Sequence, residues 1–173
     1  MSGFRIRAAE PRDVPALMRL KRLLAEGEDA VQALRASPAD WLRDGFGPQA
    51  GFTAFVAECA QARHGDGKVI GMATCSRRKL TGWNGPVVLL QDLIVEADYR
   101  SRGVARALVA RVAAFAHEVG SPIVELTVRA DNPARDFYRR AGFEPLPQCL
   151  TYVLAGPALA ELAAQAETVA PID

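Results

Sequence analysis

The stretch that decides the fold reads Tyr-Arg-Ser-Arg-Gly-Val-Ala-Arg-Ala-Leu and occupies residues 99–108. It follows an apolar run at residues 87–95 and opens an amphipathic segment at residues 102–119. This order predicts a strand, then a short basic turn that contains glycine, then a helix. The N-terminus of such a helix presents N–H groups without helical partners and the positive end of the helix dipole. Because phosphates bind at such termini, the stretch indicates a ligand that carries phosphate groups.

Length and composition limit the class of protein. The chain has 173 residues, enough for one domain with a good core, and its 21 basic residues nearly cancel its 20 acidic ones. This balance argues against nucleic-acid binding, and no apolar run reaches the length of a membrane span or a signal-peptide core. Cys59, Cys75 and Cys149 fit neither a zinc spacing nor a disulfide framework, and each is expected to be a small apolar strand residue. We therefore expect a cytoplasmic protein with no metal, no nucleic-acid partner and no membrane contact.

Strand patterns alternate with helix patterns along the rest of the chain. Strands are expected at residues 4–7, 52–57, 69–75, 87–95, 123–128 and 149–154. Helices are expected to begin near Glu10 and at Ser37, and to cover residues 102–119 and 133–141. Because residues 87–95 are apolar at nearly every position, that strand should be covered on both faces, at the centre of the sheet. The pattern predicts an α/β (α+β) domain over residues 1–155, with a C-terminal extension at residues 156–173 that is helical or frayed.

A second motif lies downstream, where residues 131–143 read Asp-Asn-Pro-Ala-Arg-Asp-Phe-Tyr-Arg-Arg-Ala-Gly-Phe. With both motifs in this order, the chain resembles the GNAT (GCN5-related) N-acetyltransferase superfamily over residues 4–154. The family's first motif, Arg/Gln-x-x-Gly-x-Gly/Ala, and its second, Asn then Phe-Tyr then Gly-Phe, match the following residues: Arg100, Gly103, Ala105, Asn132, Phe137, Tyr138, Gly142 and Phe143. The resemblance implies a central mixed, mostly antiparallel sheet of about six or seven strands flanked by about four helices. Residues 83–95 look like the diamine and thialysine acetyltransferase branch, with Gln91 where that branch has Glu.

The resemblance implies acetyl-CoA as the acetyl donor. Its pyrophosphate would bind the N–H groups of residues 102–105, and its pantetheine arm would lie along residues 93–95. That strand is expected to bulge near Ile94 and to splay from residues 123–128. The expected cofactor contacts are Leu93, Ile94, Val95, Arg100, Ser101, Arg102, Gly103, Val104, Ala105, Asn132, Phe137 and Tyr138. Whether Asp131 or Asn132 reaches the cofactor stays open, because the spacing to Tyr138 is one residue shorter than is common in the family.

Acetyl transfer to an amine needs three groups from the protein. Tyr138 matches the family position of the acid that protonates the departing thiolate, although a core aromatic would also explain it. The backbone N–H of Val95 is a candidate to stabilise the oxyanion. Gln91 cannot act as a base, so Asp92, or a water ordered by Gln91 and Asp92, is the candidate proton acceptor. A structural carboxylate is the alternative for Asp92, and Glu96 lies at the far end of the strand.

The acceptor is less well defined by the sequence. Five acidic residues in the first two expected helices and their connection would draw a cationic amine, although a solvated helix surface explains them equally: Glu26, Glu28, Asp29, Asp40 and Asp44. Trp41, Phe46 and Trp83 either line a pocket or pack. The leading hypothesis is an acetyl-CoA-dependent N-acetyltransferase that acts on a primary amine of a small molecule, polyamine-like or amino-acid-like. The alternatives are acetylation of a protein N-terminus or lysine, and an acyl-CoA sensor without turnover. Family habit suggests a homodimer.

Overall fold

The computed structural model describes residues 3–59, 67–81, 84–149 and 151–165. The chain forms two compact units, residues 1–132 and residues 133–173, and each is described by itself. Within the described residues, no helix is both long and apolar enough to cross a membrane.

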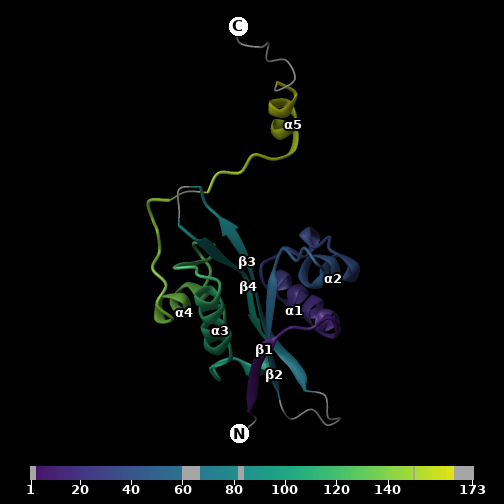
Figure 1. Ribbon diagram of the computed structural model, residues 1–173, viewed down its shortest axis with the longest axis vertical. Helices are drawn as coiled ribbons and strands as arrows, with labels where there is room; N and C mark the ends of the chain where they lie inside the picture. The colour runs from purple at the N-terminus through teal and green to yellow at the C-terminus, as the bar shows by residue number, and fades with distance from the viewer. Residues whose placement is uncertain (1–2, 60–66, 82–83, 150, 166–173) are drawn as a thin grey trace. The chain divides into compact units, whose positions relative to one another are not determined.

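The first unit is built on one sheet of five strands (Figure 1). The strands, in their spatial order, are β1 (Phe4–Ala8), β2 (Thr53–Cys59), β3 (Lys68–Lys79), β4 (Pro86–Val95) and β5 (Val124–Glu125). Neighbouring strands are antiparallel except β4 and β5, which are parallel. The sequence-based expectation of a mixed, mostly antiparallel sheet is therefore confirmed.

Helices cover both faces of this sheet. The helices α1 (Val14–Gly27) and α2 (Pro38–Phe46) lie on one face, and α3 (Val104–Glu118) lies on the other (Figure 1). On the α1 side, a core cluster contains Leu17, Leu20, Val56, Met72 and Ile94. On the α3 side, the rings of Phe55 and Phe115 meet edge to face at 5.8 Å. The strand β4 has side chains buried toward both layers, as its apolar sequence predicts.

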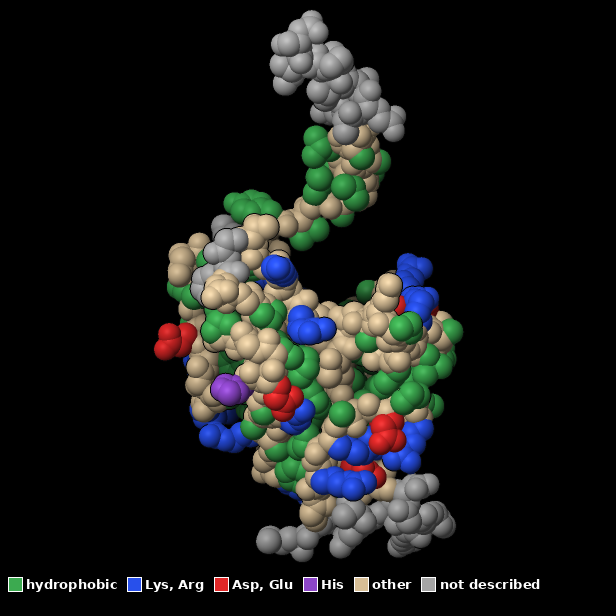
Figure 2. Space-filling view, viewed as in Figure 1, with side chains coloured by type: hydrophobic (Ala, Val, Ile, Leu, Met, Phe, Trp, Pro, Cys, Tyr) green, Lys and Arg blue, Asp and Glu red, His purple; other side chains and the backbone are tan. Residues whose placement is uncertain are grey.

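Short segments connect these elements. Single turns of 3₁₀-helix lie at Pro11–Asp13, Val31–Ala33 and Ala97–Tyr99. The predicted cap of α2 is confirmed, because Ser37 Oγ accepts a hydrogen bond from the Asp40 N–H at 3.2 Å. On the face shown in Figure 2, Lys and Arg side chains lie among Asp and Glu side chains rather than in one basic patch.

The sheet has fewer and shorter strands than the sequence indicates. Its described part has five strands, and β5 has only two residues where residues 123–128 were expected. Pairing between β4 and β5 stops at Leu89, just before a bulge in β4, and a bulge bends the strand that carries it. The described residues of the expected strand at 149–154 are not a strand, and Tyr152 and Val153 are 88% and 82% exposed. Cys59 and Cys75 are buried strand residues as expected, whereas Cys149 is exposed outside a strand.

The second unit contains two helices, α4 (Ala134–Arg140) and α5 (Gly156–Gln165). A glycine ends α4: Gly142 has φ of 100°, and Phe143 N–H donates to the Tyr138 carbonyl at 3.0 Å. This is the geometry in which glycine closes a helix, and it accounts for the Gly-Phe pair of the second motif. The side chains of residues 156–164 in α5 are exposed.

Candidate active site

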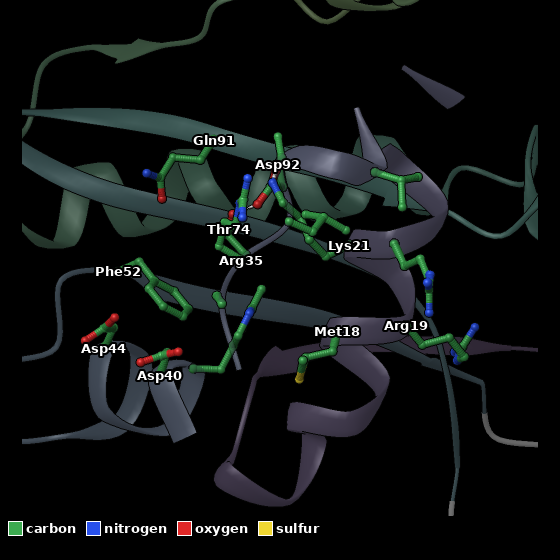
Figure 3. Close-up of a pocket in the computed structure, with 16 residues that line it drawn as sticks. Met18, Arg19, Lys21, Arg35, Asp40, Asp44, Phe52, Thr74, Gln91 and Asp92 are labelled. Carbon is green, nitrogen blue, oxygen red and sulfur yellow. Dashed lines mark hydrogen bonds and ion pairs between the residues drawn. The ribbon is translucent and has the colours of Figure 1, made fainter. Parts of the chain in front are cut away.

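A cavity of about 880 Å³ opens in the first unit, on the side of the sheet that α1 and α2 cover (Figure 3). Its walls come from α1, from the loop before α2, from α2 itself and from the strands β3 and β4. The lining residues are Met18, Arg19, Lys21, Arg22, Val31, Ala33, Leu34, Arg35, Ala36, Asp40, Trp41, Asp44, Phe52, Thr74, Gln91 and Asp92. Two of the predicted catalytic residues, Gln91 and Asp92, are therefore in one cavity.

A bulge in β4 brings these two side chains to the same side. Thr74 is opposite Asp92 and Cys75 is opposite Leu90, so Gln91 is the extra residue of β4. Successive residues of a regular strand point to opposite faces, and a bulge interrupts that alternation. The expected bulge near Ile94 is wrong by three positions. Asp92 is paired with Thr74, and the Thr74 hydroxyl also donates a hydrogen bond to its carboxylate. The regular pairing therefore continues through Asp92, and the extra residue lies just before it.

Both oxygens of the Asp92 carboxylate have partners. The Thr74 hydroxyl donates to Oδ2 at 2.7 Å, and the Lys21 ammonium donates to Oδ1 at 2.5 Å. The Asp92 side chain is 11% exposed and that of Lys21 is 33% exposed. Sequence reasoning missed Lys21, although a signal was present: it follows Leu17 and Met18 by four and three positions, on the core-facing stripe of α1. A charged residue on such a stripe indicates a buried partner or a cavity.

Glu96 belongs to a separate group of charges. Its carboxylate accepts hydrogen bonds from Arg19 and, at 2.6 Å, from Lys68. Burial raises the pKa of Glu96, but the hydrogen bonds from Lys68 and Arg19 outweigh it, and the pKa lies below its usual value. Glu96 is not among the described residues that line the cavity.

The acidic residues of α2 are neutralised within their own helix. Arg43 donates to Asp40 at 2.8 Å and to Asp44 at 2.7 Å. Hydrogen bonds from Ser37 and Arg43 lower the pKa of Asp40 to about 2, so this carboxylate is ionised at neutral pH. Both aspartates line the cavity, whereas the other acidic residues considered above, Glu26, Glu28 and Asp29, do not.

The aromatic residues divide between packing and lining. Trp41 lines the cavity and meets the ring of Phe52 edge to face at 5.2 Å. Phe46 packs against the core cluster. Trp83 lies outside the described residues.

The basic turn ahead of α3 has the backbone that its sequence predicts. Ser101 and Gly103 have positive φ angles of 59° and 81°, and Gly103 immediately precedes α3. Apart from Gly103 and its two chain neighbours, no atom of the described residues lies within 4 Å of the place where a Cβ of Gly103 would stand. Residues 100–103 are exposed, whereas Val104 is buried and fixes the first turn of the helix. The turn therefore fits a phosphate-bearing group that approaches the first N–H groups of α3.

The end of β4 leads into this turn. The Arg100 side chain donates from Nε to the Val95 carbonyl at 3.0 Å. The Glu96 N–H donates to the Ile70 carbonyl at 2.9 Å, so the alternation of an antiparallel ladder turns the backbone groups of Leu93 and Val95 away from β3. On that side, the described β5 pairs only with Val88 and Leu89. Among the described residues, pairing between these two strands thus stops at Leu89, and the side chain of Ile94 is buried in the core cluster.

The remaining predicted residues lie near the boundary of the two units or in the second one. Asp131 forms an ion pair with Arg129 at 2.8 Å, and Asn132 ends the first unit. Within the second unit, the Tyr138 ring meets the rings of Phe137 at 5.4 Å and Phe143 at 5.7 Å. The geometry brings Gln91 and Asp92 together in the cavity, whereas Tyr138 belongs to the second unit, which is described by itself.

The fold resembles that of two solved aminoglycoside acetyltransferases. A metagenomic soil aminoglycoside acetyltransferase, meta-AAC0020 in complex with sisomicin, superposes with a TM-score of 0.70 over 88% of this chain and 95% of that one, at 20% identity. Aminoglycoside N-acetyltransferase AAC(6′)-Iy in complex with CoA superposes with a TM-score of 0.68 over 89% and 96% of the two chains, at 23% identity.

Sequence comparison defines the family. Residues 22–143 match the Acetyltransferase (GNAT) family, and the chain belongs to this family of acyltransferases. It is similar to the mouse protein "Thialysine N-epsilon-acetyltransferase", with 30% identity over 94% of this chain and 99% of the relative. It is also similar to the human "Spermidine/spermine N(1)-acetyltransferase-like protein 1", with 32% identity over 67% of this chain, and it spans 17% of the length of that relative.

Proposed function

We propose that the protein transfers the acetyl group of acetyl-CoA to a primary amine of a small molecule, polyamine-like or amino-acid-like, by direct attack on the thioester. The bulge at Gln91 is the observation that carries this proposal. It turns two consecutive polar side chains into a cavity, on the strand that leads directly into the basic turn ahead of α3. The names of the relatives, a thialysine and a spermidine/spermine-type acetyltransferase, support a small amine as the acceptor.

The donor would bind where β4 meets α3. Acetyl-CoA supplies an acetyl group on a good leaving group, a thiolate. The first N–H groups of α3, with Arg100, Ser101 and Arg102 around them, would hold the pyrophosphate. The backbone groups of Leu93 and Val95, which face away from β3, would hydrogen-bond the pantetheine arm, and the Val95 N–H would stabilise negative charge on the carbonyl oxygen.

The proton path needs an acceptor for the amine proton and a donor for the thiolate. Thr74 and Lys21 already bind both oxygens of Asp92, so we propose that Asp92 and Gln91 hold the water that takes the proton from the amine. The neutral amine then attacks the carbonyl carbon, and the bond from carbon to sulfur breaks. Tyr138 is the proposed proton donor to the departing thiolate, with Asn132 and Phe137 as proposed contacts of the cofactor near it.

Release of the CoA thiol from acetyl-CoA, measured across a panel of small primary amines, tests this function. We expect release that depends on the amine and saturates with it. Tight binding of CoA without release for any amine would instead identify an acyl-CoA sensor. Release with peptides only would identify a protein acetyltransferase.

The substitution Asp92→Asn tests the role of the carboxylate, because it keeps the size of the side chain and removes its charge. We expect kcat to fall about 100-fold, the size of a typical acid–base contribution, and the rise of kcat with pH to change. Asp29→Asn is the matched control, since Asp29 is an exposed aspartate that does not line the cavity. A kcat whose pH dependence is the same in Asp92→Asn and the wild type would exclude Asp92 from the proton path.

A further inference from the structure

One cationic side chain of the cavity has no acidic partner among the described residues. Four basic and three acidic side chains line the cavity. Three of the basic ones are paired: Lys21 with Asp92, Arg19 with Glu96, and Arg22 with Glu26. Arg35 is the fourth, and its guanidinium forms no hydrogen bond or ion pair with the part of the chain that the structure describes.

The acids of the cavity do not compensate this charge. Asp92 is held by Lys21 and Thr74, and Arg43 binds both Asp40 and Asp44 from outside the cavity lining. The acidic surface that would attract a polyamine is therefore already neutralised by neighbouring cations. Arg35, an exposed residue of the cavity wall, therefore leaves an excess of positive charge at the cavity.

The loop that carries Arg35 is fixed at its C-terminal end. Residues 33–36 all take part in the cavity wall, directly before Ser37. Ser37 and Asp40 hydrogen-bond each other in both directions, with the Ser37 N–H donating to the Asp40 carboxylate at 2.8 Å. A cap of this kind sets where the helix starts, and so it limits the positions that Arg35 can take two residues earlier.

We propose that Arg35 binds a carboxylate on the acceptor, and hence that the acceptor is an amino-acid-like amine rather than a polyamine; this rests on the proposed function. A guanidinium presents parallel N–H donors that match the two oxygens of a carboxylate. Met18, Leu34 and Trp41 supply apolar wall for the methylene chain that joins carboxylate to amine. Arg35 comes from the loop before α2 and Gln91 from β4, so the two ends of such an acceptor would meet different walls of the cavity (Figure 3).

Matched acceptors test this assignment. L-Lysine, L-lysine amide and 1,5-diaminopentane carry the same terminal amine and chain, but only lysine carries a carboxylate; ornithine and 1,4-diaminobutane form a shorter pair. We expect the wild type to have a higher kcat/KM for the amino acids. Arg35→Gln should lower kcat/KM for the amino acids roughly 10- to 100-fold, mostly through KM, and leave the diamines and the amide nearly unchanged.

Arg12→Gln is the control for a change in net charge, because Arg12 is 69% exposed and outside the cavity lining. Arg35→Lys, which keeps the charge without the fork of N–H groups, should recover part of the loss. A wild type that prefers the diamines, or an Arg35→Gln variant that loses activity equally on all acceptors, would overturn the assignment. If no amine supports thiol release, the proposed function fails. Calorimetry with CoA-saturated protein then tests Arg35 separately, by comparing the binding of lysine with that of 1,5-diaminopentane. Lysine binding that is equal to or weaker than diamine binding would overturn the assignment of Arg35.

Discussion

Two groups of charges contact the same helix, α1, and they differ in what surrounds them. At the start of α1, Arg7 lies between the carboxylates of Asp13 and Glu58. Further along, Lys21 binds Asp92 beside Thr74. The first group has no member among the residues of the cavity wall, whereas all members of the second group line it.

The first group joins three elements of the fold. Arg7 in β1 donates to Asp13 at 2.6 and 2.9 Å and to Glu58 in β2 at 2.6 Å. Asp13 also accepts from the Glu10 N–H at 2.7 Å, which fixes the turn that begins α1. The side chains of Arg7 and Asp13 are only 17% and 6% exposed. The three guanidinium nitrogens of Arg7 and both carboxylate oxygens of Asp13 are bonded within the fold, so the expected contribution of this group is to stability.

The second group has a similarly covered carboxylate but a different cation. The Asp92 side chain is 11% exposed, a fraction similar to the 6% of Asp13. Its partner Lys21 is 33% exposed and carries its charge on a flexible four-carbon chain. Breaking an ion pair that reaches solvent through a cavity costs less stability than breaking a buried one, because water can hydrate the charge left behind, and such a pair remains accessible to a ligand. Burial of the carboxylate alone therefore does not separate structural from functional charges; the solvent exposure of its cationic partner does.

The largest expected effect is the loss of stability in Arg7→Met. Removing the cation leaves two covered carboxylates without their main partner, which costs about 3 kcal/mol of unfolding free energy. Urea denaturation measures this loss, and the kcat of the folded variant should stay close to that of the wild type. Arg12→Gln, at the exposed side of the same turn, should change stability by less than about 0.5 kcal/mol.

If the unfolding free energy of Arg7→Met were within about 0.5 kcal/mol of the wild type, the Arg7 group would contribute no more than a surface ion pair. The proposed difference in stability between the Arg7 group and the Lys21–Asp92 pair would then be wrong.

The next effect in size is expected in Lys21→Met, which breaks the pair in the cavity. We expect about 1–2 kcal/mol of lost stability, because solvent can hydrate Asp92 through the cavity. The kcat should fall about tenfold, because Thr74 alone then orients the carboxylate. A double-mutant cycle with Asp92→Asn measures whether both effects pass through the pair. If Lys21→Met lost as much stability as Arg7→Met and kept its kcat, the Lys21–Asp92 pair would be structural, like the Arg7 group.

The sequence predicts the proposed donor side of the site better than the proposed acceptor side. The basic turn, the start of α3 and the buried strand before it depend on local patterns: a glycine with positive φ, a periodic helix and an apolar run. Each feature needs only its own few residues, so each can be inferred from the chain without its partners.

The acceptor side depends on contacts between residues far apart in the chain. Lys21 and Asp92 are separated by 71 positions, and Thr74 joins them from a third element. The bulge was predicted near Ile94 but lies at Gln91. The pairing of two strands, rather than the composition of one, decides where an extra residue fits. The acidic residues of α2 suggested an amine site, but Arg43 on the same helix neutralises Asp40 and Asp44.

The smallest expected effect is a pH dependence of stability that belongs to the Arg7 group. Burial raises the pKa of Asp13, but hydrogen bonds from Arg7 and from the Glu10 N–H outweigh it and lower that pKa; the Arg7 hydrogen bond also lowers the pKa of Glu58. A carboxyl whose pKa is lower in the folded state stabilises the fold above its unfolded pKa, and this contribution is lost as the pH falls through the folded value. The ordinary values are 3.8 for Asp13 and 4.5 for Glu58.

The difference in unfolding free energy between the wild type and Arg7→Met should therefore be constant near neutral pH and narrow below about pH 4.5. Urea denaturation of both proteins at several pH values measures it. Other carboxyls with a lowered pKa, such as Glu96, titrate alike in both proteins and cancel in the difference. A difference that keeps its size at about pH 3 would mean that Arg7→Met loses the packing of the arginine stem rather than its charge. The Arg7 group would then stabilise the fold through apolar contacts of the arginine stem. Its difference from the Lys21–Asp92 pair would lie in side-chain packing rather than in electrostatics.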